Sequence, residues 1–182
     1  MEKEKNLNIP NILSVIRICL IPLFVITYFS QRHITATAIL LVSGITDVLD
    51  GFIARHFNLT TSLGKILDPF ADKTTQIAIW VCLAIKFYYI PLMIPIACIF
   101  FLKELVMMIG GFKILKSRKP MASSRWFGKI GTLIFYCVTI FIIATTDIVS
   151  PTLVMALMIF SVAYMLFALV MYVPLYFKIK KM

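Results

Sequence analysis

The stretch Leu153–Phe177 reads LVMALMIFSVAYMLFALVMYVPLYF and contains no charged residue. A helix needs about 20 apolar residues to cross the hydrocarbon core of a bilayer, so this stretch is long enough to span it. Of the 182 residues in the whole chain, 61% are hydrophobic and only 14% are charged. A soluble domain is usually about 45–50% apolar and about 25% charged. These values exclude a soluble protein and predict an all-α integral membrane protein.

Working outward from that stretch, polar breaks divide the chain into six transmembrane helices. We expect them near residues 10–29, 34–56, 63–85, 90–116, 126–146 and 151–176. Six spans with short loops use almost the whole chain, which predicts one domain over residues 1–182. Residues 1–9 alternate in charge and are expected either to form a short interfacial helix or to be disordered. The first span is too long for a cleaved signal peptide and carries Arg17.

The basic residues predict the orientation of these spans. With a cytoplasmic N-terminus, 13 Lys and Arg residues fall on the inner side and two, Arg32 and Lys86, on the outer side. Short cytoplasmic loops are enriched in Lys and Arg, so both termini are expected on the cytoplasmic side. The membrane is expected to be the cytoplasmic (plasma) membrane. The same bias explains the net charge of +10 without nucleic acid, and we expect no nucleic-acid partner.

The acidic residues inside the spans carry the functional information. They are Asp47, Asp50, Asp68, Asp72 and Glu104. A carboxylate at membrane depth costs at least about 2.5 kcal/mol, and such residues are functional by default. The alternative is a structural ion pair, for which Arg17, Lys73 and Lys103 are available.

Four of these carboxylates are expected to converge. Asp47 and Asp50 are spaced i,i+3, and Asp68 and Asp72 are spaced i,i+4, so each pair shares a helix face. A hairpin brings both pairs to a similar depth, roughly 8–14 Å below the cytoplasmic surface at 1.5 Å per residue. Like charges this close must be partly protonated or have cations among them. Clustered oxygen ligands suit Mg²⁺, Mn²⁺ or Ca²⁺ better than zinc.

Small residues lie next to the acidic pairs. Gly44, Gly51 and Ala54 line one side of the second span, and Gly64 opens the third. Small residues let a helix or a ligand approach the backbone closely. Arg55 stands beside them and could bind a phosphate.

The segment from Asp47 to Asp72 resembles the signature of the CDP-alcohol phosphotransferases, D-x2-D-G-x2-A-R-x8-G-x3-D-x3-D, at all eight fixed positions. The resemblance implies an enzyme that moves a phospho-alcohol group from a CDP-alcohol to a hydroxyl acceptor and releases CMP. It implies two metal ions, usually Mg²⁺ with Mn²⁺ as the alternative, held by the four aspartates. It also implies a homodimer that meets through its membrane spans.

The resemblance also implies roles for single residues. Asp47, Asp50 and Asp68 would be metal ligands, and Asp72 would be a ligand or the general base. The donor, CDP-diacylglycerol, would contact Asp47, Gly51, Ala54, Arg55, Gly64 and Asp68.

Two further segments resemble phosphatidylglycerophosphate synthases and the related cardiolipin synthases. They are Ile9–Ser14 followed by Arg17, and Leu67–Lys73. This implies glycerol-3-phosphate as acceptor, with its phosphate near Lys103, Arg125 and Lys129.

Two departures from the synthase pattern leave the acceptor open. The fourth span has Leu102-Lys103-Glu104 where those synthases commonly show A-R-E, and the fifth begins Gly128-Lys129-Ile130-Gly131-Thr132 instead of G-K-x-K-T. Lysine keeps the charge of arginine but not its bidentate geometry. A cardiolipin synthase that uses the lipid alcohol phosphatidylglycerol as acceptor is therefore the alternative.

Functions of other classes fit less well. A divalent-cation transporter needs acidic residues through the full depth of the bilayer, and the last two spans contain none. A scaffold without activity would be expected to have lost a carboxylate of the signature, and none is lost.

Overall fold

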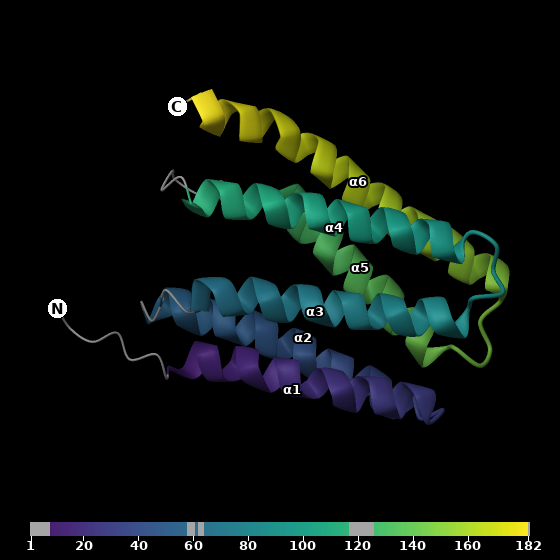
Figure 1. Cartoon of the computed structure of the whole chain (residues 1–182). Coiled ribbons are helices and arrows are strands. Elements are labelled where there is room, and N and C mark those ends of the chain that lie inside the picture. The colour runs from purple at the N-terminus through teal and green to yellow at the C-terminus, as the bar shows by residue number, and fades with distance from the viewer. Residues whose placement is uncertain (1–7, 58–60, 62–63, 117–125, 182) are drawn as a thin grey trace. The chain divides into compact units, whose positions relative to one another are not determined.

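The computed structural model describes residues 8–57, 61, 64–116 and 126–181 (Figure 1). Over these residues the chain is all-helical, as predicted, with six helices and no strand. They are α1 (Ile9–Phe29), α2 (His33–His56), α3 (Gly64–Lys86), α4 (Met93–Lys116), α5 (Trp126–Ala144) and α6 (Pro151–Lys181). The helix bounds follow the expected spans closely, and the largest difference is that α6 continues to Lys181. Most of the segment expected as an interfacial helix, residues 1–7, lies outside the described residues.

The helices belong to two compact units. The first comprises residues 1–85 with residues 143–146, and the second comprises residues 86–142 and 147–182. The first unit therefore contains α1, α2 and nearly all of α3, and the second contains α4, α6 and most of α5.

In the first unit, α1 and α2 form a hairpin and pack against each other (Figure 1). The turn is tight because Gln31 adopts the left-handed conformation, with φ of 60°. The backbone N–H of Arg32 donates to the carbonyl of Thr27 at 3.0 Å. Beside the turn, the buried ring of Tyr28 lies 5.3 Å from that of His33. The hairpin places the N-terminal half of α1 beside the C-terminal half of α2.

Helix α3 completes the core of the first unit. Its buried side chains include Ile79, Trp80 and Leu83. A mostly apolar hollow is lined by residues of all three helices, which shows that they meet there. The lining residues are Leu20, Ile21, Phe24, Ile39, Leu40, Ser43, Thr75 and Ala78.

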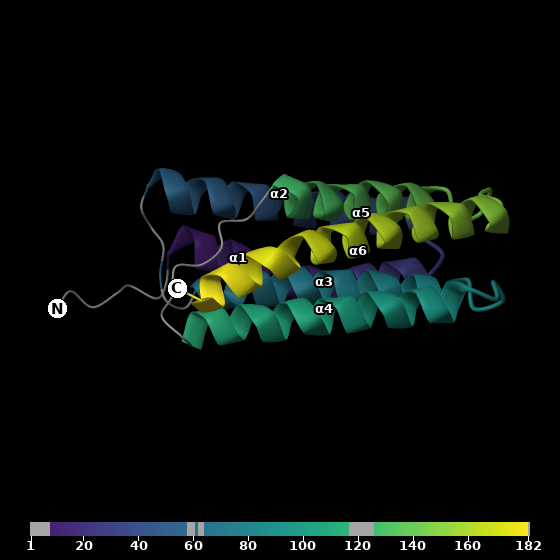
Figure 2. The ribbon, with the colours of Figure 1, turned by 90° about the horizontal axis from the view of Figure 1, so that it is seen from above.

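In the second unit, α4 packs against α6, and the two lie side by side in both views (Figures 1 and 2). Aromatic rings join α5 to its neighbours. Phe135 of α5 stacks on Phe100 of α4 at 5.5 Å, and Phe127 of α5 meets Tyr172 of α6 edge to face at 4.8 Å. Each helix of this unit is thus tied to the next by buried apolar contacts.

Four helices of the described chain are long and apolar enough to cross a membrane. These candidate spans are Ile9–Phe29, His33–Ala54, Trp126–Ala144 and Pro151–Tyr172. Helix α3 is not among them, and it carries Asp68, Asp72 and Lys73 near its start. Large apolar side chains such as Ile34 and Val48 are exposed, as expected for surfaces that face lipid. Four of the six expected spans are thus candidate membrane spans in the described chain, and the six-span arrangement stays a prediction.

Candidate active site

One face of α1 carries a buried polar stripe. Asn11, Ser14 and Arg17 recur every three residues, so their side chains lie on the same face of the helix. Their exposed fractions are 4%, 0% and 1%. A buried polar side chain needs a partner, since burial without one costs several kcal/mol. Ser14 and Arg17 find partners among the aspartates of α2 and α3, and Asn11 finds its partner in Thr61, just before α3.

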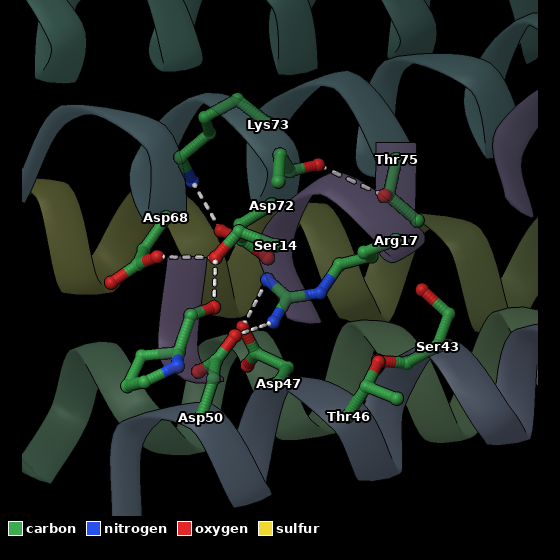
Figure 3. A network of polar contacts seen from close by, with 12 residues as sticks. Ser14, Arg17, Ser43, Thr46, Asp47, Asp50, Asp68, Asp72, Lys73 and Thr75 are labelled. Atoms are coloured by element: carbon green, nitrogen blue, oxygen red, sulfur yellow. Dashed lines mark hydrogen bonds and ion pairs between the residues drawn. The ribbon is translucent and has the colours of Figure 1, made fainter. Parts of the chain in front are cut away.

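Arg17 forms ion pairs with both carboxylates of α2 (Figure 3). Its Nη1 contacts Oδ1 of Asp47, and its Nη2 donates to Oδ2 of Asp50. The two carboxylates differ in exposure, because the Asp50 side chain is 4% exposed and the Asp47 side chain is 46% exposed. One guanidinium therefore balances part of the charge of the pair from the buried side and leaves Asp47 open to the surroundings.

Ser14 contacts the first carboxylate of α3. Its hydroxyl donates to Oδ1 of Asp68 at 2.5 Å and lies 3.2 Å from the carbonyl oxygen of Pro10 in its own helix. A hydrogen bond to an ionised carboxylate is stronger than one to a neutral acceptor, so the Asp68 contact is the one that dominates. Helix α1 thereby touches three of the four signature aspartates.

The fourth aspartate, Asp72, has partners in α3 itself. The side-chain amide Nε2 of Gln76 lies 3.2 Å from Oδ1 and 3.3 Å from Oδ2 of Asp72. Lys73 Nζ lies 3.6 Å from Oδ2, and it also donates to the Gln76 Oε1 at 3.2 Å. Gln76 is fully buried, so it holds Asp72 in a defined orientation from inside the unit.

The two acidic pairs face each other across the polar end of α1 (Figure 3). Asp47 of α2 is close enough to interact electrostatically with both Asp68 and Asp72 of α3. Among the described residues no three metal-ligating side chains are grouped closely enough to hold an ion, so a metal site at these aspartates stays a prediction. Arg17 stands against one of the two pairs and offsets part of the repulsion between their like charges.

A second cluster closes the start of α3. Thr61 Oγ1 accepts the backbone N–H of Gly64 at 3.0 Å, which caps the helix N-terminus. The side-chain amide of Asn11 donates to the same hydroxyl at 3.1 Å. A Cβ atom on Gly64 would lie 2.6 Å from Asn11 Oδ1, so any larger residue here would force the Asn11 side chain to shift. Beside Gly44, by contrast, a Cβ would meet no atom of the described residues within 4 Å, so no neighbouring helix approaches closely there.

This geometry accompanies a match to a known family. The model of the CDP-alcohol phosphatidyltransferase family matches residues 7–174. The chain belongs to this family. The matched range includes all of the polar stripe on α1 and all four aspartates.

Several relatives in the CDP-alcohol phosphatidyltransferase family have names that state glycerol-3-phosphate as the acceptor. A CDP-diacylglycerol–glycerol-3-phosphate 3-phosphatidyltransferase of Aquifex aeolicus is 35% identical over 130 residues, which are 70% of this chain and 70% of the relative. The enzyme of the same name from Haemophilus influenzae is 45% identical over 75 residues, 39% of this chain and 40% of the relative. A cardiolipin synthase (CMP-forming) / mitochondrial hydrolase fusion protein of Schizosaccharomyces pombe is 37% identical over 84 residues, 46% of this chain and 14% of the relative.

The remaining predicted residues lie in three situations. Gly51 and Ala54 are partly buried in α2, while the side chain of Arg55 lies outside the described residues. In the second unit, Lys103 forms an ion pair with Glu104, which agrees with the structural alternative for this lysine. Lys129 is exposed on α5, and Arg125 lies outside the described residues. A common acceptor site for Lys103, Arg125 and Lys129 stays a prediction.

Asn11, Ser14 and Arg17 were not predicted as parts of the site. In the sequence, Asn11 and Ser14 indicate only a subfamily, and Arg17 indicates the same subfamily and an available partner for a structural ion pair. The signal that could have found them is their spacing, because three polar residues at i, i+3 and i+6 on an otherwise apolar span must face the protein interior.

Proposed function

We propose that this member of the CDP-alcohol phosphatidyltransferase family transfers the phosphatidyl group of CDP-diacylglycerol to glycerol-3-phosphate. The products are phosphatidylglycerophosphate and CMP. The observation that carries the proposal is the arrangement of two acidic pairs on α2 and α3 around α1, within the stretch that bears the family signature. The names of the Aquifex aeolicus and Haemophilus influenzae relatives support the choice of donor and acceptor.

The reaction breaks one P–O bond and forms another. The acceptor hydroxyl oxygen attacks the phosphorus that carries diacylglycerol, and the bond from that phosphorus to CMP breaks. Asp72 is the residue that takes the hydroxyl proton, because a carboxylate within hydrogen-bond reach can act as general base. Gln76 orients Asp72 through its amide, and Lys73 Nζ lies 3.6 Å from Oδ2 of the same carboxylate.

The chemical type of the aspartate side chains also suits a metal site. Asp47, Asp50, Asp68 and Asp72 offer only oxygen ligands, which Mg²⁺ and Mn²⁺ prefer, and the partly exposed side chain of Asp47 leaves room for approach. They would hold two divalent cations. When bound, such ions stabilise negative charge on a diphosphate and its leaving group.

The position of the site in the membrane follows from the donor. Its acyl chains stay in the bilayer, so its headgroup must reach the aspartates from the membrane side. We propose six membrane spans with both termini and the site on the cytoplasmic side of the plasma membrane, as the distribution of basic residues indicates. The polar acceptor then enters from the cytoplasm, and the enzyme acts as a homodimer.

A second candidate is a cardiolipin synthase that uses phosphatidylglycerol as acceptor. The ion pair of Lys103 with Glu104 favours it, because a lysine already held by a carboxylate is a weaker partner for an acceptor phosphate. The similarity to the Schizosaccharomyces pombe cardiolipin synthase fusion protein supports it as well.

One assay distinguishes the two. The purified protein in detergent is supplied with CDP-diacylglycerol and Mg²⁺, and CMP release is measured with glycerol-3-phosphate, phosphatidylglycerol, serine and inositol in parallel. We expect release with glycerol-3-phosphate that EDTA abolishes and added Mg²⁺ restores. Release with phosphatidylglycerol alone would establish the cardiolipin synthase, and silence with all four would refute both candidates.

A further inference from the structure

The guanidinium of Arg17 is held in place by charge alone. It is 1% exposed and pairs with both Asp47 and Asp50. Its Nε is buried and makes no hydrogen bond to any residue that the structure describes. Among the described residues its polar contacts are thus the two carboxylates, and its position depends on their negative charge.

A divalent cation between the acidic pairs would oppose this arrangement. Asp47 faces Asp68 and Asp72 as well as Arg17, so a cation shared by these carboxylates lies in the field of a buried positive charge. Arginine stays protonated under all ordinary conditions, and the guanidinium cannot relieve the repulsion by losing a proton. Repulsion between like charges in a poorly hydrated interior is only weakly screened. The cation and Arg17 thus compete for the same carboxylates.

We propose that Arg17 is an internal counter-cation that exchanges with the metal ion. In the metal-free protein it balances part of the charge of Asp47 and Asp50 and keeps the polar site intact within the unit. When a divalent cation binds, the ion takes over the carboxylates and the contacts of Arg17 weaken. This inference rests on the proposed function, because it requires a divalent cation at the aspartates.

The alternative is that Arg17 only positions the carboxylates, as outer partners of metal ligands commonly do. The two roles predict opposite effects on metal affinity. Removal of a counter-cation strengthens binding of the ion, while removal of a positioning group weakens it. Ser14 supplies a matched control, because it contacts Asp68 from the same face of α1 without carrying charge.

The experiment measures Mn²⁺ binding to the full chain in detergent by electron paramagnetic resonance. We expect Arg17→Gln to bind Mn²⁺ about tenfold more tightly than wild type, the lower end of what outer partners do to metal affinity. Arg17→Lys keeps the charge and should stay within about twofold of wild type, because the ammonium still opposes the ion. Ser14→Ala should bind Mn²⁺ more weakly. The thermal unfolding temperature gives a second readout. Without metal, Arg17→Gln should unfold at a lower temperature than wild type, and added Mg²⁺ should raise its unfolding temperature by more than it raises that of wild type.

The outcomes separate this inference from the proposed function. A wild-type protein that binds Mn²⁺ and an Arg17→Gln variant that binds it equally or more weakly would overturn the counter-cation alone. A wild-type protein that binds no Mn²⁺ would overturn the metal assignment and the inference with it. If Arg17→Gln does not fold, the ¹⁵Nε resonance of Arg17 in the wild type, assigned by its loss in Arg17→Lys, decides. It should shift during a Mg²⁺ titration, and a resonance unchanged at saturation would refute the exchange.

Discussion

The hydroxyl of Ser14 on α1 donates a 2.5 Å hydrogen bond to Oδ1 of Asp68 on α3, across 54 positions of the sequence. The signature motif lies entirely in α2 and α3, so this contact extends the site to a helix outside the motif. Arg17 of the same helix forms ion pairs with Asp47 and Asp50, so α1 lines the site and is also a candidate membrane span.

Replacement of Ser14 by alanine tests whether the contact of α1 with Asp68 contributes to the site. Loss of the hydroxyl leaves one oxygen of Asp68 without its partner, and we expect the apparent Mg²⁺ requirement for CMP release to rise about tenfold. The measurement is the Mg²⁺ dependence of initial rates. Ser161→Ala is the control, because Ser161 is equally buried and its hydroxyl donates to the carbonyl of Met158 in its own helix. An unchanged Mg²⁺ dependence in Ser14→Ala would argue that the contact is incidental.

Asp72→Asn is expected to lower CMP release by at least about 100-fold, since general-base catalysis contributes 10²–10⁴-fold. Asparagine has nearly the same shape, so the variant should insert into membranes as the wild type does. The rate is compared with that of Asp147→Asn, whose carboxylate lies between α5 and α6. Normal turnover by Asp72→Asn would remove Asp72 from the mechanism.

Gly64→Ala and Gly44→Ala form a matched pair. At Gly64 the new methyl group would lie 2.6 Å from Asn11 Oδ1 and 3.2 Å from Thr61 Oγ1, so the Asn11 side chain must shift and its hydrogen bond to Thr61 is disturbed. We expect Gly64→Ala to lower the free energy of unfolding by about 1–3 kcal/mol. Gly44→Ala meets open space and should be neutral or slightly stabilising, because alanine favours a helix interior. Thermal unfolding of both variants in detergent gives the comparison, and equal destabilisation would contradict the close contact at Gly64.

Lys129→Ala tests the acceptor prediction. Lys129 is exposed on the first turn of α5, where a phosphorylated acceptor could reach it. Loss of one charged hydrogen bond to phosphate should raise the apparent KM for glycerol-3-phosphate about tenfold, with little change in kcat. Lys86→Ala, expected on the opposite side of the membrane, should leave KM unchanged. A KM unaffected in Lys129→Ala would place the acceptor phosphate elsewhere.

The sequence was sufficient to predict the helices. Long uncharged runs such as Leu153–Phe177 leave a chain no alternative to helix inside a bilayer, because each backbone polar group must be satisfied within its own segment. The polar breaks between the runs therefore fall close to the observed helix ends. The acidic pairs were predictable for a related reason, since charge at membrane depth requires a function or a partner.

The partners of the aspartates were harder to predict. A periodic pattern shows which residues share a face of one helix, but it does not show which helix that face meets. The face with Asn11, Ser14 and Arg17 could have met any of the other spans. The ion pair of Arg17 with Asp47 and Asp50 thus became visible only when α1 and α2 were placed side by side.

Arg17 also has a consequence for how the protein enters the membrane. It is synthesised 30 positions before Asp47, so α1 emerges from the ribosome with a charge whose partners do not yet exist. An arginine at the centre of an isolated span costs about 2.5–3.5 kcal/mol on insertion scales. The ion pairs remove that cost only after α2 has arrived. Biogenesis should therefore favour insertion of α1 and α2 together as a hairpin. The ion pairs of Arg17 with Asp47 and Asp50 would then stabilise the hairpin during insertion, before they contribute to the finished site.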